Sequence, residues 1–118
     1  MPAVSLTPSL SSADQMPLPN FARLQAAAGQ ASALLKVLSH PDRLLLLCQL
    51  SQGEYCVSEL EALIGLGQPS LSQQLGVLRQ EGLVSTRRAG KQIYYQIASE
   101  DALAVLQVMY QRFCPDDL

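Results

Sequence analysis

The period of the apolar residues changes twice along this chain, and no other feature restricts the fold as much. In "LVSTRRAGKQIYYQI", residues 83–97, apolar and polar residues alternate in two runs about Ala89 and Gly90, which is the pattern of a β-hairpin. Before and after this segment the apolar residues follow the helical period. The sequence therefore predicts a mainly α-helical fold with one small β-hairpin.

Three helices are predicted in the first half of the chain. Asn20 can cap a helix that runs to about residues 36–38, because its side-chain oxygen can accept a free backbone N–H. Pro41 in "SHPDR" has the fixed φ of a first helical turn and starts a short, mostly buried helix. A third helix begins in "CVSELEALIGLG" and ends at Gly65.

Two further helices complete the predicted order, ααααβ-hairpin-α. Gln68 or Ser70 can cap the fourth helix, in "QPSLSQQLGVLRQEGLV", and Gly82 ends it. Ser99 can cap the last helix, in "ASEDALAVLQVMYQRFC", which has acidic residues in its first turn. The helices on both sides of the hairpin are thus predicted with their boundaries.

One domain is expected, preceded by a leader. The 118 residues are 48% hydrophobic and 15% charged, which is enough for a packed core. Residues 1–19 hold four of the seven prolines and no periodic pattern, so we expect a flexible leader there and the folded domain in residues 20–118. No apolar run suits a membrane span or a secretory signal, so we expect a cytoplasmic protein without a membrane partner.

The fourth helix is unusual because its outward positions carry uncharged hydrogen-bonding groups. Leu71, Leu75 and Leu78 form its inward face, and the side chains expected to point outward are Gln68, Ser70, Ser72, Gln73 and Gln74. Gln can bond adenine through two groups at once, and Ser can bond a base edge or a phosphate. Two short helices joined by a tight turn and followed by a hairpin predict a winged helix-turn-helix that reads double-stranded DNA.

The net charge of −2 hides a basic region around this helix and the hairpin. From residue 68 to residue 95 there are four basic residues against one acid, which leaves four basic and nine acidic residues elsewhere. We expect the four to hold phosphates or reach a minor groove; they are Arg79, Arg87, Arg88 and Lys91. The alternatives are a solvated surface patch or a protein-interaction module that binds no DNA.

Over about residues 21–114 the sequence resembles the ArsR family of winged-helix repressors. The resemblance is carried by "SHPDRL" and "SLSQQLGVLRQEGLV", and it is closer still to the BigR/SqrR branch, whose members respond to hydrogen sulfide and persulfides. That branch carries one Cys in the second helix and one near the end of the last helix, and Cys48 and Cys114 stand at the matching positions.

The resemblance implies a dithiol switch. Reactive sulfur species would produce a disulfide or polysulfide link between Cys48 and Cys114, release operator DNA and derepress genes for sulfide detoxification. From the residues alone, Cys48 in "LLLLCQL" can instead be a small buried hydrophobe whose surroundings raise its thiol pKa. Cys56 has no counterpart in the branch and is expected to be structural or incidental.

Two other regulatory mechanisms known in this family remain as alternatives. One is a redox-responsive antirepressor of virulence genes like the related HlyU proteins, and the other is a metal-responsive repressor. Arsenite-binding members carry several Cys on the third helix, where "CVSELE" keeps only Cys56, and zinc-binding members use His on the last helix, whereas the single histidine is His40. We expect His40 to start a helix or pack, and we expect no metal and no cofactor.

Neither an enzyme nor a monomer is expected. Because His40 is the single histidine, no Ser-His-Asp catalytic triad is possible without it. Neither a phosphate-binding loop nor a dinucleotide-binding segment occurs in the sequence. The Ala-rich first helix and the apolar last helix would expose more apolar surface than one small domain can cover. We therefore expect a homodimer whose reading helices lie one DNA turn, about 34 Å, apart on an imperfect inverted repeat.

Overall fold

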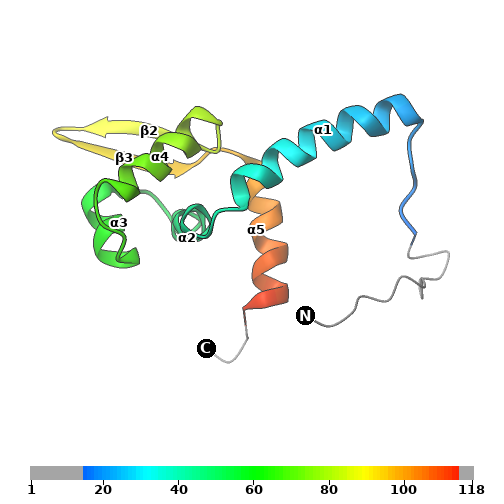
Figure 1. The fold of residues 1–118 in the computed structure, drawn as a ribbon. Helices are drawn as coiled ribbons and strands as arrows, with labels where there is room; N and C mark the ends of the chain where they lie inside the picture. The colour runs from blue at the N-terminus through cyan, green and yellow to red at the C-terminus, as the bar shows by residue number, and fades with distance from the viewer. Residues whose placement is uncertain (1–14, 115–118) are drawn as a thin grey trace.

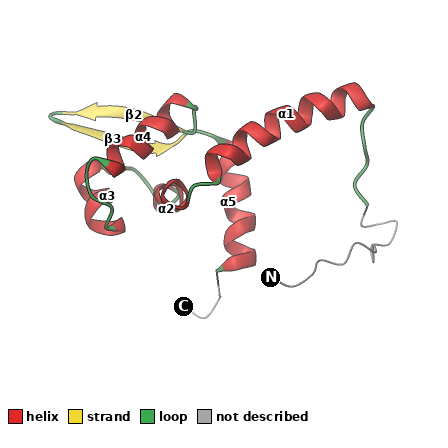
Figure 2. Ribbon diagram, viewed as in Figure 1, coloured by secondary structure: helices red, strands yellow, loops and turns green. Residues whose placement is uncertain are grey.

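The predicted mainly helical winged fold is confirmed within residues 15–114, which the computed structural model describes (Figures 1 and 2). The elements in chain order are α1 (Phe21–Leu38), α2 (Pro41–Leu50), β1 (Tyr55–Cys56), α3 (Val57–Ile64), α4 (Ser70–Gln80), β2 (Val84–Ala89), β3 (Gln92–Ile97) and α5 (Glu100–Phe113). Most of the predicted leader, residues 1–14, and the last four residues of the predicted domain lie outside the described residues. The division into leader and domain stays a prediction.

Side-chain caps start the first and the last helix as predicted. The Asn20 side chain accepts a hydrogen bond from the backbone N–H of Arg23 at 2.9 Å. The Ser99 hydroxyl accepts one from the backbone N–H of Ala102 at 3.0 Å. Each cap satisfies a backbone donor that the helix itself leaves free, which contributes about 1 kcal/mol.

The start of α2 and the end of α4 are set by different local interactions. His40 Nδ1 accepts the backbone N–H of Asp42 at 3.1 Å, so the single histidine caps α2, in agreement with its expected place at a helix start. At the far end, Gly82 has a φ of 78°, a left-handed conformation that glycine adopts without strain. The chain then reverses, and the N–H of Leu83 donates to the carbonyl of Leu78 at 2.9 Å, which ends α4 in the manner of a Schellman motif.

The hairpin is the larger part of a three-stranded antiparallel sheet with the order β1-β3-β2. Ala89 pairs with Gln92, so Gly90, with a φ of 63°, and Lys91 make the turn one residue later than predicted. The short strand β1, which the sequence did not reveal, pairs Tyr55 with Tyr95. It fastens the start of α3 to the base of the hairpin.

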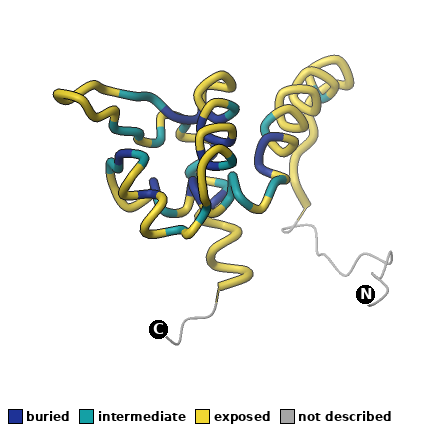
Figure 3. Tube along the Cα trace, turned by 60° about the vertical axis from the view of Figure 1, so that its left-hand side comes forward, coloured by how far each residue is buried: buried dark blue, intermediate teal, exposed yellow. Residues whose placement is uncertain are grey.

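The core lies where α2, α3, α4 and the base of the hairpin meet, and it is made largely of leucine. The side chains that are fully buried are Leu46, Leu47, Leu60, Leu71, Leu75 and Leu78. Burying each contributes about 1.5–3 kcal/mol, so this cluster holds the helix-turn-helix together. In contrast, α1 and the hairpin project from this centre in opposite directions, and α1 buries only Val37 and Leu38 (Figures 1 and 3).

Candidate nucleic-acid interface and cysteine site

The outer face of α4 presents uncharged polar side chains beside the hairpin. Gln68, Ser72 and Gln73 are exposed, and Ser70 is half-buried. The prediction that Gln68 or Ser70 caps α4 is wrong. Pro69 holds the N-cap position, and its side chain has no hydrogen-bond acceptor. Gln68 instead accepts a hydrogen bond from the Ser72 hydroxyl, and this bond fixes the start of the polar face.

The prediction that Gln74 points outward is wrong. Only 7% of Gln74 is exposed, and its Oε1 accepts a hydrogen bond from Nη1 of Arg43 at 3.0 Å. Gln74 lies three residues after Leu71 and four before Leu78, so the helical period places it on the inner side with them. Arg43 Nε also donates to the carbonyl of Val37 at 2.6 Å, and one guanidinium therefore connects α1, α2 and α4.

The basic residues of the hairpin differ in how freely they could meet a phosphate. Arg88 and Lys91 are exposed near the tip, and Arg79 is exposed at the end of α4. Arg87 is exposed as well but forms an ion pair with Glu54, at 2.8 Å from Nε to Oε2.

Arg87 is held in place by contacts with Glu54 and Tyr94. The guanidinium carbon lies 4.8 Å from the centre of the Tyr94 ring, so Arg87 stacks on the sheet while it binds the carboxylate. The hydrogen bond to Glu54 and the charge of Glu54 both raise the pKa of Arg87. In this arrangement Arg87 fastens the hairpin to the loop before β1, and contact with a phosphate would require it to leave Glu54.

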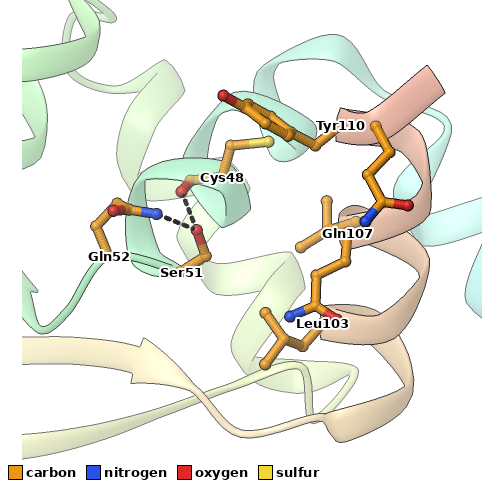
Figure 4. Close-up of a pocket in the computed structure, with 8 residues that line it drawn as sticks. Cys48, Ser51, Gln52, Leu103, Gln107 and Tyr110 are labelled. Atoms are coloured by element: carbon orange, nitrogen blue, oxygen red, sulfur yellow. Dashed lines mark hydrogen bonds between the residues drawn. The ribbon is translucent and has the colours of Figure 1, made fainter. Parts of the chain in front are cut away.

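Of the two cysteines singled out by the sequence, Cys48 lies on α2 and Cys114 directly follows α5. The Cys48 side chain points toward Tyr110 of α5 (Figure 4). Cys114 is the C-cap residue of α5, and its backbone N–H donates to the carbonyl of Tyr110 at 2.9 Å. Both are exposed free thiols, which is contrary to the interpretation of Cys48 as a buried hydrophobe.

The electrostatics also connect these two thiols. Partial burial raises the pKa of Cys48 above its usual value, and the negative charge of a Cys114 thiolate raises it further. A charge effect of this kind requires the two groups to lie within electrostatic reach of each other. At neutral pH, Cys48 is therefore held in its thiol form more firmly than an ordinary cysteine.

A pocket of about 590 Å³ lies between α2 and α5 beside Cys48 (Figure 4). Its lining includes Cys48, Gln52, Leu106, Gln107, Tyr110 and Gln111. The Ser51 hydroxyl at its edge donates to the Cys48 carbonyl at 2.6 Å and accepts from the Gln52 amide at 3.1 Å. This pocket was not predicted from the sequence, because its walls come from two segments that are far apart in the chain, residues 48–52 and 103–111.

Cys56 stands apart from this pair. It is 4% exposed, pairs with Tyr94 in the sheet, and its backbone N–H donates to Oε1 of Glu59 at 2.9 Å. Its Sγ lies 3.3 Å from the Ser58 hydroxyl. These contacts fix the start of α3 and agree with the structural role expected for Cys56.

Two further properties concern metals and membranes. Between residues 15 and 114 no group of three or more His, Cys, Asp or Glu side chains is arranged to hold a metal ion. In the same part of the chain, no helix combines the length and apolar character needed to cross a bilayer.

Apolar side chains remain uncovered on α1 and α5. The large ones that are at least 42% exposed on these helices are Phe21, Leu35, Val108, Met109, Tyr110 and Phe113. A small monomeric domain rarely leaves such a set in water on two adjoining helices. These helices therefore offer a surface for association.

Comparison with known proteins places this geometry in a family. The family model described as "Bacterial regulatory protein, arsR family" matches residues 40–86, which span α2 to the first part of β2. The biofilm growth-associated repressor of Agrobacterium fabrum is 48% identical over 100 residues, which are 85% of this chain and 83% of that protein.

Two other relatives are similar over comparable lengths. The crystal structure of the transcriptional repressor BigR from Xylella fastidiosa aligns with a TM-score of 0.76 and 48% identity, and covers 80% of this chain and 97% of that one. The transcriptional activator HlyU of Vibrio cholerae is 33% identical over 95 residues, or 80% of this chain and 88% of that protein.

Proposed function

The chain belongs to the ArsR family of bacterial regulatory proteins, and on that basis we propose that it is a DNA-binding transcriptional repressor that senses reactive sulfur species through Cys48 and Cys114. The expectation that it is not an enzyme is confirmed by this membership, because the family consists of regulatory proteins. Two relatives that are 48% identical to it are named repressors, which supports the direction of regulation.

The outer face of α4 supports the proposed reading of DNA. We propose that α4 enters the major groove, where Gln68, Ser70, Ser72 and Gln73 meet base edges and phosphates. Gln74 is left out of this set because Arg43 holds it inside. Arg79, Arg88 and Lys91 would contact the phosphates that flank the groove, and Arg87 would join them on exchanging Glu54 for a phosphate.

Association through α1 and α5 would place two reading helices on one DNA face. A two-fold dimer buries the same apolar patch on both subunits and presents the two copies of α4 to an imperfect inverted repeat. The exposed apolar residues of α1 and α5 support this arrangement, since pairing would remove them from water.

The proposed sensing step is a two-stage sulfur exchange. Cys114, as thiolate, attacks the outer sulfur of a persulfide RSSH, so that a Cys114 persulfide forms and RSH leaves. Cys48, as thiolate, then attacks the inner sulfur of that persulfide, which gives a Cys48–Cys114 disulfide and releases HS⁻. The persulfide is the two-electron oxidant. If both thiols first gain a sulfur, the same attack leaves a trisulfide and again releases HS⁻.

The order of attack follows from the pKa of Cys48. Its raised pKa makes it the poorer nucleophile at neutral pH, so we assign the first attack to Cys114. A covalent link between Cys48 and Cys114 would tie the end of α5 to α2. In a dimer, this would change the angle between the two helix-turn-helix units. To empty an operator that is nearly full, the link must disfavour the bound form by about 5 kcal/mol, which a covalent constraint can supply.

The observation that carries this proposal is the placement of two exposed free thiols, Cys48 on α2 and Cys114 directly after α5, which packs beside α2 at the pocket. The test uses reduced protein bound to the DNA upstream of its own gene. A glutathione persulfide donor is added, fluorescence anisotropy follows release, and intact-mass spectrometry reads the sulfur gained. We expect release from the wild type and from Cys56→Ser, but not from Cys48→Ser or Cys114→Ser. Unchanged release in all four proteins would refute the dithiol switch.

A second direction of regulation has one observation in its favour. A relative that is 33% identical is named a transcriptional activator, so activation or displacement of another repressor is the alternative. A reporter gene behind the upstream DNA separates the two. Deletion of this protein raises reporter expression if it represses and lowers expression if it activates.

A further inference from the structure

The pocket beside Cys48 has an uncharged lining. Its walls contribute a thiol and a hydroxyl, together with the amides of Gln52, Gln107 and Gln111 and the side chains of leucine and tyrosine. No Asp, Glu, Lys, Arg or His side chain is part of this lining within the described residues. Its volume, about 590 Å³, is that of a site for a small organic molecule.

Among the described residues, none of the side chains that line this pocket is basic. The causes of the raised Cys48 pKa are burial and the charge of Cys114, and neither is a cation. Arg112 is next to Gln111 in the sequence, but it does not line the pocket. A carboxylate that entered would lose water without gaining a counter-charge, whereas an uncharged molecule would lose little and could bond the three amides.

We propose that this pocket binds the sulfur donor before the exchange, and that it prefers uncharged organic donors such as dialkyl trisulfides over donors that carry carboxylates. This inference rests on the proposed sulfur-sensing function and narrows its substrate class. The apolar groups of the donor would lie against Leu106 and Tyr110, and its sulfur chain would lie near Cys48, toward the end of α5 that Cys114 follows.

The chemistry of such a donor balances without a further oxidant. A thiolate of the pair attacks a terminal sulfur of RSSSR, which forms a mixed disulfide with one RS group and releases RSS⁻. The second thiolate attacks the cysteine sulfur of that mixed disulfide. A Cys48–Cys114 disulfide results and RS⁻ leaves, so the trisulfide accepts both electrons.

The test compares two trisulfides that differ in charge. Reduced full-length protein is mixed with diallyl trisulfide or with glutathione trisulfide, and the rate of disulfide formation is followed by intact mass. Each rate is divided by the rate of the same donor with the free thiol N-acetylcysteine amide, which removes differences in intrinsic reactivity. We expect the normalised rate to favour diallyl trisulfide by about tenfold or more, since a carboxylate near an uncompensated thiolate is repelled.

Matched variants localise the effect to the pocket. Gln107→Lys adds a positive charge to the lining, while Ala104→Lys adds the same charge at an exposed position of α5 outside it. We expect Gln107→Lys to raise the normalised rate for glutathione trisulfide several-fold and Ala104→Lys to leave it within about twofold. Equal normalised rates in the wild type, or equal effects of both lysines, would overturn the inference.

The outcomes separate this inference from the function it rests on. If both trisulfides link Cys48 to Cys114 at the same normalised rate, the dithiol switch stands and the preference for uncharged donors falls. If neither trisulfide links the two cysteines, although both react with the free thiol, the proposed sensing function fails as well.

Discussion

Nη1 of Arg43 donates a hydrogen bond of 3.0 Å to Oε1 of Gln74, across 31 residues of the sequence. The same guanidinium donates at 2.6 Å to the carbonyl of Val37 at the end of α1. That carbonyl is among the last four of the helix, which have no partner within it. Arg43 therefore fixes α4, the proposed reading helix, against the helix whose exposed face we assign to the dimer.

Replacing Arg43 by methionine should destabilise the protein. The change leaves the Gln74 amide and the Val37 carbonyl without their donor, which costs about 1–3 kcal/mol of unfolding free energy. Urea denaturation measures the loss, with Arg23→Met on the exposed part of α1 as the control. In a double-mutant cycle, Gln74→Leu should recover part of the cost of Arg43→Met. Strictly additive effects would mean that the hydrogen bond contributes nothing.

Replacing Gln73 by alanine should reduce sequence discrimination. Gln73 is exposed on α4, and loss of a good contact to a base edge costs about 1–3 kcal/mol for the cognate site only. Competition between operator and random duplex DNA in anisotropy titrations measures this ratio. Gln96→Ala, an exposed glutamine on β3, serves as the control and should leave the ratio unchanged. Equal losses on both DNAs would indicate that Gln73 contacts the backbone.

Replacing Glu54 by glutamine should strengthen DNA binding. The change releases Arg87 from its ion pair and removes a negative charge from the loop before β1, beside the hairpin. We expect an affinity gain of about two- to fivefold and a salt dependence steeper by about one phosphate contact. Glu61→Gln on the exposed side of α3 controls for net charge. An unchanged salt slope would show that Arg87 does not reach a phosphate.

The reactivity of Cys48 should rise at a higher pH than that of an ordinary thiol. Burial and the Cys114 charge raise its pKa, so alkylation by iodoacetamide in Cys56→Ser protein should reach half its maximal rate above about pH 8.5. Adding Cys114→Ser should move the midpoint down but leave it above the usual value, since burial persists. Peptide mass spectrometry follows the label on Cys48. A midpoint at or below the usual value would contradict the burial effect.

The raised pKa of Cys48 also makes the stability of the folded protein depend on pH. A folded-state pKa above the unfolded value means that the native state favours the protonated thiol. The contribution is therefore complete below the unfolded pKa, about 8.5, and is lost as pH rises through the folded pKa. Cys48→Ser should show a smaller fall in urea midpoint than the wild type over this alkaline range. Parallel falls would assign the loss to other groups.

Replacing Phe21 by aspartate should weaken the proposed dimer. Phe21 is 72% exposed on α1, and a carboxylate there would be desolvated without a partner in a paired state. Leu63→Asp, at a leucine 56% exposed on α3, is the control. Sedimentation velocity at micromolar concentration should give a dimer for the wild type and the control, and a larger monomer fraction for Phe21→Asp. A monomeric wild type would refute the dimer.

Local sequence signals predicted much of the fold because their physical causes are local. The Asn20 and Ser99 caps, the Gly82 helix end and the alternation of the hairpin each depend on neighbouring residues. The two-residue strand β1 is too short to show an alternation, so it was missed. The orientation of Gln74 was predicted wrongly although its spacing from the buried leucines was a local signal. The polar side chain was taken as a sign that the residue points outward.

The site was predicted less completely because its parts meet only through packing. Arg43 belongs to "SHPDR", and no neighbouring residue indicates that its side chain reaches Gln74 or Val37. Likewise, the pairing of Arg87 with Glu54 joins residues 33 positions apart. The facing of α2 and α5, which creates the uncharged pocket between them, is a property of the assembled core.

Arg43 and Cys48 lie on one short helix, five residues apart. At 1.5 Å per residue they are separated by about 7.5 Å along the helix axis, and their side chains point in directions about 140° apart around it. We expect a sideways pull on the Cys48 sulfur to shift α2 as a whole, because a hydrogen-bonded helix of 10 residues bends little, and so to move the Arg43 guanidinium as well. Under the proposed mechanism α2 would act as a lever that carries a displacement from Cys48 to α4, to which Arg43 is bound through Gln74.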